Sequence, residues 1–244
     1  MELTLDQLHK AALQLNATLP EVEFGKERIR KAKPFKELTY RETAAFLRDF
    51  TALSESRSFS ERELSNMLAG TCIETASFLF AAGAAAPRWR EWCAIGGFLV
   101  ALAQQPSYAM QLLAIARVPP DDPAFARLQG IRPGNYREQA IQFVIFGGAD
   151  SVRPTLSPQD DALERCYSEL VRAFVQRDAV LASRAVSEAA EVWLEETSYG
   201  TFEPGVFPVF EPELNSVVAA LVRQKLTLRF DRAKIEMFVQ AGLE

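Results

Sequence analysis

Apolar residues recur at helical spacing along almost the whole chain. Near the N-terminus, one such stripe consists of Leu5, Leu8, Ala12 and Leu15. Positions three and four residues apart share one face of an α-helix, whereas a half-buried strand needs strict alternation, which no segment shows convincingly. Strands and helices also do not alternate along the chain as they do in α/β proteins. The pattern therefore predicts an all-α protein of roughly ten helices.

Capping residues predict two long apolar helices in the first half of the chain. Ser60 and Glu63 form a capping box that opens a helix expected to run to about Ala84. Pro87 is suited to the first turn of a second helix that ends near Leu102. Small residues are frequent in both segments, so the two helices can approach each other closely.

Proline and glycine divide the rest of the chain. Breaks are expected at residues 118–123, 132–135 and 147–148, with a helix at 136–146 between the last two. Ser157 followed by Pro158 predicts the start of a helix that runs to about Gln176. A turn at residues 177–178 then leads into a second helix, which ends near Glu196, so the two form a hairpin. The last helices are expected at 213–225 and 232–241.

The expected architecture is a single all-helical domain, residues 1–244, built from helical hairpins. Stacked hairpins can form a solenoid, although no repeat of the usual length recurs. A junction between two helical halves near residues 147–158 is the alternative to one uninterrupted domain. The chain is long enough to bury a substantial core in either arrangement.

Composition is typical of a soluble protein with an acidic balance. The net charge is −5, and hydrophobic residues make up 48% of the chain. The acidic balance argues against general nucleic-acid binding, which needs cations to neutralise phosphates. The basic run Lys26–Lys36 is interpreted as a solvated helix face.

The N-terminus has no secretory signal pattern, and the apolar runs are too short to span a membrane. We therefore expect a cytoplasmic protein without membrane contact, with Cys72, Cys93 and Cys166 as buried free thiols.

Few residues are suited to catalysis. His9 is the only histidine, and it lies on a surface helix, so neither a serine nor a cysteine nucleophile has a convincing base. Neither a phosphate-binding glycine loop nor a CxxC zinc spacing occurs. We therefore expect a protein that is not an enzyme, with no catalytic, cofactor-binding or metal-binding residues.

Asp160, Asp161 and Glu164 form the one carboxylate motif that suggests a metal. They resemble the DDxxD-like motifs of helical isoprenoid synthases, in which two facing helices hold magnesium against a diphosphate. The second motif of such a site is missing here. Acids in the first turn of a helix capped by Ser157 explain the same residues. A magnesium-diphosphate enzyme is therefore the third hypothesis for function.

Residues 188–213 combine seven glutamates and five aromatic residues without one lysine or arginine. The carboxylates can steer a basic partner towards this segment, and aromatic residues in a loop can anchor that partner. We predict a partner-binding surface made of Glu195, Glu196, Tyr199, Phe202 and Glu203. The alternative is that the aromatic residues fill the core, while some of the acids pair with the basic C-terminal stretch.

The C-terminal third resembles a known family. A helix from Leu163, a turn through Val175–Val180, a helix ending near Trp193 and the segment Phe210–Leu221 follow one another in this order. In this they resemble the all-helical immunity proteins of bacterial polymorphic toxin systems, particularly immunity protein family 49. The similarity covers residues 160–228.

Members of that family are encoded beside a toxin and neutralise it by binding. The resemblance therefore implies a cognate toxin as partner. Such a toxin is expected to be basic if it is a nuclease, because its substrate is polyanionic. A helical scaffold or adaptor for another protein is the second hypothesis, and the identity of the neighbouring gene distinguishes the two.

Overall fold

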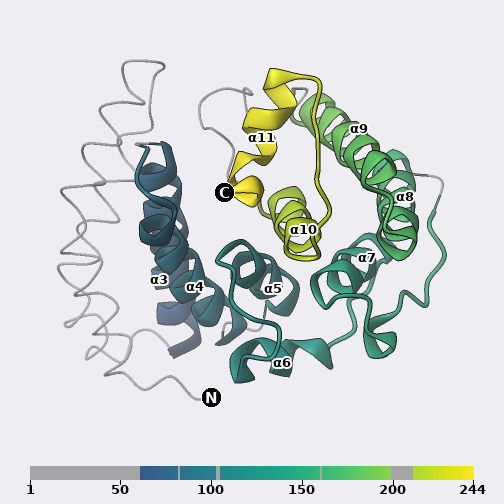
Figure 1. The fold of residues 1–244 in the computed structure, drawn as a ribbon. Coiled ribbons are helices and arrows are strands. Elements are labelled where there is room, and N and C mark those ends of the chain that lie inside the picture. The colour runs from purple at the N-terminus through teal and green to yellow at the C-terminus, as the bar shows by residue number, and fades with distance from the viewer. Residues whose placement is uncertain (1–60, 82, 103–104, 160, 199–210) are drawn as a thin grey trace. The chain divides into compact units, whose positions relative to one another are not determined.

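The computed structural model describes residues 61–81, 83–102, 105–159, 161–198 and 211–244 (Figure 1). Across these residues the chain forms nine α-helices and one 3-10 turn, with no strand, which confirms the all-α prediction. The stripe at residues 5–15, His9 and the run Lys26–Lys36 lie outside the described residues. The helices are α3 (Glu61–Ala81), α4 (Ala86–Leu102), α5 (Pro106–Ile115), α6 (Pro123–Gln129), α7 (Tyr136–Ile145), α8 (Ala162–Gln176), α9 (Ala179–Ser198), α10 (Pro212–Arg223) and α11 (Ala233–Leu243).

The chain forms two compact units, residues 1–109 and 110–244. The boundary falls within α5. The predicted junction near residues 147–158 lies inside the second unit, where it includes the 3-10 turn Asp150–Val152.

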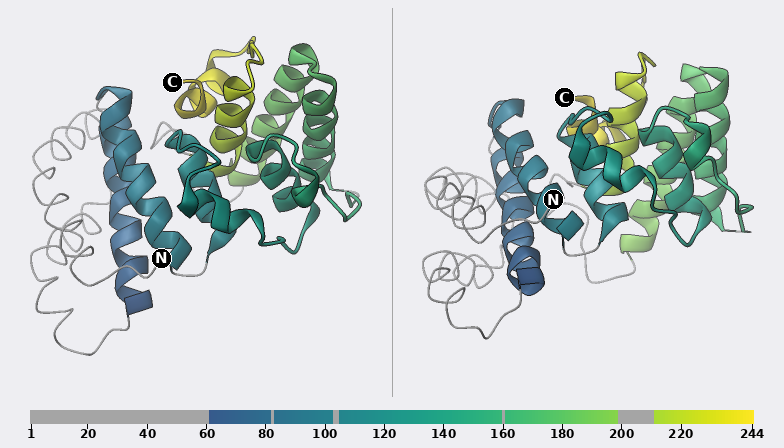
Figure 2. Two further views of the ribbon diagram at one scale, coloured as in Figure 1. Left: turned by 60° about the horizontal axis from the view of Figure 1, so that its bottom comes forward. Right: turned by 90° about the horizontal axis from the view of Figure 1, so that it is seen from below.

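Helices α3 and α4 form a closely packed antiparallel pair in the first unit, side by side in every view (Figures 1 and 2). Gly96 on α4 makes the close approach possible, because a Cβ atom there would lie only 3.3 Å from Cys72 Cβ on α3. The fully buried Trp89 meets Phe80 edge to face, with ring centroids 5.5 Å apart. Gly96, one of the small residues predicted to permit close helix contact, therefore lies at the α3–α4 interface.

Helix α10 is buried on all sides over most of its length. Residues 214–221 are all buried, and α10 packs against α7, α9 and α11 (Figure 1). The helix begins at Pro212, one residue before the predicted start. A helix that is buried on all sides needs neighbours all round. The core of this unit is therefore built around α10.

Two polar side chains join α10 to α11. The amide of Asn215, which is fully buried, donates to the carbonyls of Glu211 and Phe238 and accepts from Gly242 N at 2.8 Å. Arg117, which follows α5, donates to Ala219 O and Gly242 O, both at 2.6 Å. Polar groups in a core need such partners, so these bonds fix how the two helices cross.

Two glutamines on α7 hold the loops on either side of it. Gln142 donates to two carbonyls in the last turn of α6 and to Ile131 O in the loop that follows, the shortest contact being 2.7 Å to Ile131 O. Gln139 donates to Pro133 O and accepts from Thr155 N at 2.9 Å. The segment that leads to α8 is thereby attached to α7.

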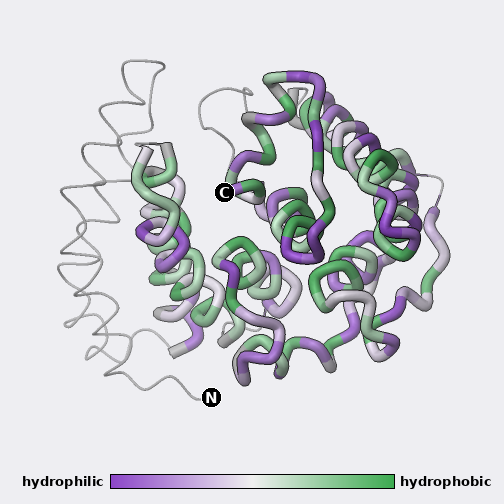
Figure 3. Tube along the Cα trace, in the orientation of Figure 1, coloured by the Kyte–Doolittle hydropathy of each residue, from purple (hydrophilic) through white to green (hydrophobic). Residues whose placement is uncertain are grey.

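Helices α8 and α9 form the predicted hairpin and lie side by side in all views (Figures 1 and 2). Hydrophobic and hydrophilic positions alternate around both helices, as Figure 3 shows, so each buries one face. The predicted start of α8 at Ser157 is wrong. Asp161 is the N-cap instead, and its carboxylate accepts from Glu164 N at 2.9 Å.

Candidate interaction surfaces

The predicted partner-binding residues are only partly within the described residues. Glu195 lies near the end of α9 and is exposed. Glu196 belongs to α9 as well, but its side chain is outside the described part. Tyr199, Phe202 and Glu203 also lie outside it. Of the predicted surface, the structure therefore places one side chain, and it faces solvent.

The outer face of α9 carries a row of five residues at helical spacing: Val180, Arg184, Glu188, Glu191 and Glu195. Three of these residues are acids, and they lie from the middle of the helix to its C-terminal end. Arg184 Nε lies 3.8 Å from Glu188 Oε1, and Arg232 pairs with Glu191. Within the described residues Glu195 has no ion pair. The acidic charge of this face therefore increases towards Glu195.

Glu211, at the other end of the acidic segment, is buried, with 6% of its surface exposed. Its carboxylate is the N-cap of α10 and accepts from Glu213 N at 3.0 Å and Leu214 N at 2.6 Å. Burial raises the pKa of Glu211 to about 8, although these hydrogen bonds oppose the shift. Glu211 therefore belongs to the core and is unavailable for steering a partner.

Glu213, in the first turn of α10, is the centre of a second group of interacting polar side chains. Arg137 Nε on α7 lies 3.3 Å from its Oε2 atom, and Tyr167 of α8 and Trp193 of α9 interact with the same carboxylate. Burial raises the pKa of Glu213, and Arg137 counteracts that rise. Three helices thus contact the first turn of α10 through one side chain.

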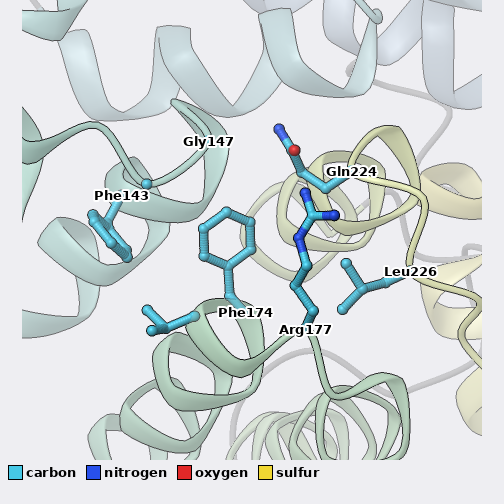
Figure 4. A pocket seen from close by; sticks show the side chains of 8 residues that line it. Phe143, Gly147, Phe174, Arg177, Gln224 and Leu226 are labelled. Atoms are coloured by element: carbon cyan, nitrogen blue, oxygen red, sulfur yellow. The ribbon is translucent and has the colours of Figure 1, made fainter.

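A pocket of about 220 Å³ lies where three helices end (Figure 4). Gly147 and Gly148 follow α7, Arg177 follows α8, and Gln224 follows α10. In Figure 4 the side chain of Arg177 extends between Phe174 and Leu226 towards Gln224. The C-terminal ends of helices carry partial negative charge, so this is a place where cations are favoured.

Three residues other than glycine adopt the left-handed conformation in the described residues, and all three are basic: Arg117, Arg177 and Lys225. Each follows a helix and closes it with paired backbone hydrogen bonds, such as Asp178 N to Ala173 O at 2.9 Å. Glycine is favoured at such positions, because other residues are strained there. Arg117 uses its side chain to join α10 and α11. In contrast, no partner for the side chains of Arg177 and Lys225 is present in the described part of the chain.

Two exposed valines flank the turn of the α8–α9 hairpin. Val175 is 60% exposed and Val180 is 82% exposed. Val175 also lines the pocket beside Arg177. An exposed apolar side chain beside a recess, such as Val175, suits contact with another protein.

Of the three candidate metal residues, Asp160 lies outside the described residues, whereas Asp161 and Glu164 take part in the start of α8. Asp161 caps the helix, and the Glu164 carboxylate accepts from Gln159 N at 2.5 Å. Among the described residues, no group of three or more histidine, cysteine or acidic side chains could hold a metal ion.

Cys72, Cys93 and Cys166 are buried free thiols, as predicted, and burial raises the pKa of each.

The buried acids could not be recognised from the sequence. Glu211, Pro212 and Glu213 form an acid-rich helix start, but their partners Arg137 and Tyr167 are distant along the chain.

Among the described helices, none has both the length and the apolar character needed to cross a membrane. Comparisons with protein-family models, curated proteins and solved structures find no match for this chain.

Proposed function

We propose that this protein is an immunity protein that binds a cognate toxin acting in the bacterial cytoplasm and neutralises it by occlusion, without catalysis. The observation that carries the proposal is the exposed outer face of α9, where acidic charge increases towards Glu195. This face lies within residues 160–228, which carry the resemblance to immunity protein family 49. The resemblance provides the class of partner, and the exposed acids provide its charge.

The charge of the protein favours a basic partner. Its net charge is −5, and the acids at the end of α9 would attract cations on a toxin such as a nuclease. In this proposal Glu195, Glu196 and Glu203 steer the toxin, while Tyr199 and Phe202 make the anchoring contacts. Charges at the rim of an interface mainly affect the association rate, whereas a buried anchor affects dissociation.

Co-expression with the product of the adjacent gene tests the proposal. We expect the two proteins to purify together and the toxin to lose its effect on cell growth. A neighbouring gene without toxic effect, or a toxin that kills cells despite co-expression, would rule the proposal out.

Association kinetics test which surface faces the toxin. Reversing Glu195, Glu196 and Glu203 to lysine should slow association at low salt and have much less effect at high salt. The matched control reverses Asp121, Asp150 and Glu236, which are exposed acids outside α9, and changes the net charge equally. If both triple variants slow association to the same extent, net charge alone steers the toxin.

Single substitutions test the anchors. Tyr199→Ala or Phe202→Ala should speed dissociation by an amount worth more than about 1 kcal/mol if the residue is an anchor. Unchanged helicity and melting of each variant exclude unfolding as the cause. Unaltered dissociation in both would place the anchoring contacts elsewhere.

A helical adaptor for another protein is the second candidate. The exposed Val175 and Val180 favour it, since they suit a protein partner of any kind. An adaptor need not be encoded beside a toxin. The neighbouring gene therefore distinguishes the two candidates.

A further inference from the structure

We propose that residues 226–230, in the connection between α10 and α11, pair antiparallel with the same residues of a second copy of this chain. The two segments would form a short ladder across a twofold axis centred on Leu228. This surface is distinct from the toxin-facing residues proposed above and does not depend on them. Residues 226–230 are called the edge segment below.

The edge segment is extended. It forms neither a helix nor a turn, and Arg232, just beyond it, has backbone angles of the β region (φ −119°, ψ 117°). From Lys225 to Asp231 the side chains alternate between exposed and covered positions, and Leu226 is buried. Alternation with a period of two is typical of a strand that covers a core with one face. In Figure 1 no ribbon passes in front of this yellow connection.

The backbone of the edge segment has one open side. Within the described residues it donates only two hydrogen bonds, to Leu221 O at 3.1 Å and, from Arg229 N, to Ser183 Oγ of α9 at 3.0 Å. In a strand, the N–H and C=O of one residue point to the same side, and successive residues alternate. Since Arg229 faces α9, the groups of Leu228 and Phe230 face the other side. No described residue bonds them, so this side is an open strand edge.

The charges at the two ends of the edge segment favour a second copy as the partner. Lys225 precedes the segment and Asp231 follows it, and both are exposed without an ion pair in the described part of the chain. Antiparallel pairing about Leu228 places Lys225 of each copy opposite Asp231 of the other. Opposite charges across a strand pair are favourable, whereas parallel pairing would bring like charges together. The edge is therefore complementary to itself in the antiparallel direction.

The ladder follows from this register. The two Leu228 residues exchange N–H···O bonds, and the N–H of each Phe230 reaches the carbonyl of Leu226 in the other copy. The edge segment contains no proline, which would interrupt such a ladder. A ladder of this length is smaller than a standard interface, so we expect a reversible dimer.

Sedimentation equilibrium of the full chain, from about 10 µM to 1 mM, tests the proposal. We expect a monomer–dimer equilibrium that weakens as salt is raised. Lys225→Asp and Asp231→Lys should each weaken dimerisation at least about tenfold, because each places like charges opposite one another twice. Aspartate tolerates the left-handed conformation of Lys225 (φ 64°), so folding should be preserved.

A mixture of these two variants gives the sharpest comparison. In a mixed dimer, every contact between positions 225 and 231 again joins opposite charges. The mixture should therefore dimerise about as well as the parent, which reduced stability of either variant could not produce. Arg153→Asp and Asp150→Lys, at exposed positions outside the connection, are the matched controls and should each dimerise as the parent does.

Proline substitutions test the backbone bonds. Leu228→Pro removes the central N–H groups of the ladder and should weaken dimerisation at least about tenfold. Thr227→Pro is the matched control, because the Thr227 N–H lies on the α9 side and takes no part in the ladder. Thermal melting establishes that both variants are folded.

Several outcomes would overturn the proposal. A parent chain that stays monomeric at about 1 mM would leave the edge to a strand of another protein. Dimerisation that neither charge reversal weakens, or a mixture that stays monomeric, would exclude the antiparallel register. Equal losses from Leu228→Pro and Thr227→Pro would exclude the ladder. No toxin is needed for these measurements, so their failure leaves the proposed immunity function untouched.

Discussion

At the scale of single residues, similar backbone strain at Arg117 and Arg177 has different consequences. Both residues are left-handed, with φ values of 63° and 55°. Of the two, only Arg117 has side-chain partners on other helices within the described residues, and these are backbone carbonyls of α10 and α11. A substitution that relieves strain at both positions therefore removes stabilising contacts at only one of them.

We predict that Arg177→Gly raises the free energy of unfolding by about 1 kcal/mol, because glycine avoids the left-handed strain. Arg117→Gly should lower it by about 2 kcal/mol or more, since two charge-assisted hydrogen bonds are lost. Urea unfolding of both variants measures the difference. Destabilisation of similar size in both would show that the side chain of Arg177 is as important to the fold as that of Arg117.

The pKa of Glu211 makes stability depend on pH. The folded pKa of about 8 lies above the ordinary value of 4.5, so the folded state binds a proton that the unfolded state releases. The stabilisation is complete below the unfolded pKa and is lost as pH rises through the folded one. Glu213 reinforces the rise and Arg137 opposes it. One such proton changes stability by at most about 1.4 kcal/mol per pH unit.

We predict that the free energy of unfolding of Glu211→Gln increases relative to the parent between about pH 5 and pH 8, because the variant has no proton to lose there. Urea titrations across this range measure the difference. Glu195→Gln is the control, as Glu195 is exposed and should show no such trend. A difference between Glu211→Gln and the parent that stays constant with pH would contradict the assignment.

At the scale of elements, local chemistry determines most helix boundaries. The predicted limits of α3, α4, α9 and α10 agree with the structure to within a few residues, because their caps and breakers act on neighbouring residues. Helices α5 and α6 have no counterpart among the helices predicted individually. Ser157 was the cap predicted for α8, whereas Asp161 caps it in the structure. The bond from Thr155 N to Gln139 on α7 holds the preceding loop, and such a distant contact is not visible in a local pattern.

The candidate surfaces, too, depend on contacts between distant residues that a local sequence pattern does not reveal. The acidic character of α9 could be predicted from composition, but the burial of Glu211 and Glu213 depends on helices that are distant in sequence. The pocket depends on three helix ends that meet only in the folded chain. Arg177, the basic residue that lines it, follows a helix end and belongs to no recognisable motif. Local sequence therefore predicted the elements better than the sites.

The crossing of α10 and α11 depends on a glycine. We predict that Gly242→Ala lowers the free energy of unfolding by about 1–3 kcal/mol, because its new Cβ would lie 2.5 Å from Asn215 O. Gly70→Ala is the matched substitution within α3, where a new Cβ meets nothing within 4 Å, and it should stabilise by about 0.5–1 kcal/mol. Thermal melting distinguishes the two. Equal effects of the two substitutions would mean that the α10–α11 contact tolerates a wider separation.

At the scale of the whole molecule, each compact unit has buried apolar residues of its own. Trp89 and Leu99 belong to the first unit, whereas Val217 and Val218 belong to the second. A core of its own allows a unit to open without its neighbour, so one overall stability need not describe both. Chain length and composition alone did not distinguish this arrangement from a single domain.

The three buried thiols make this division measurable without any label being engineered. Cys72 and Cys93 lie in the first unit and Cys166 in the second, so each thiol reacts with an alkylating reagent only when its own surroundings open. We predict that Gly242→Ala accelerates alkylation of Cys166 by roughly tenfold for each 1.4 kcal/mol of lost stability and leaves Cys72 and Cys93 unaffected. Peptide mass spectrometry over time gives the three rates in one sample. Parallel acceleration at all three sites would mean that the units open together. The alkylation rates of the three cysteines therefore report whether the molecule unfolds in one step or in two.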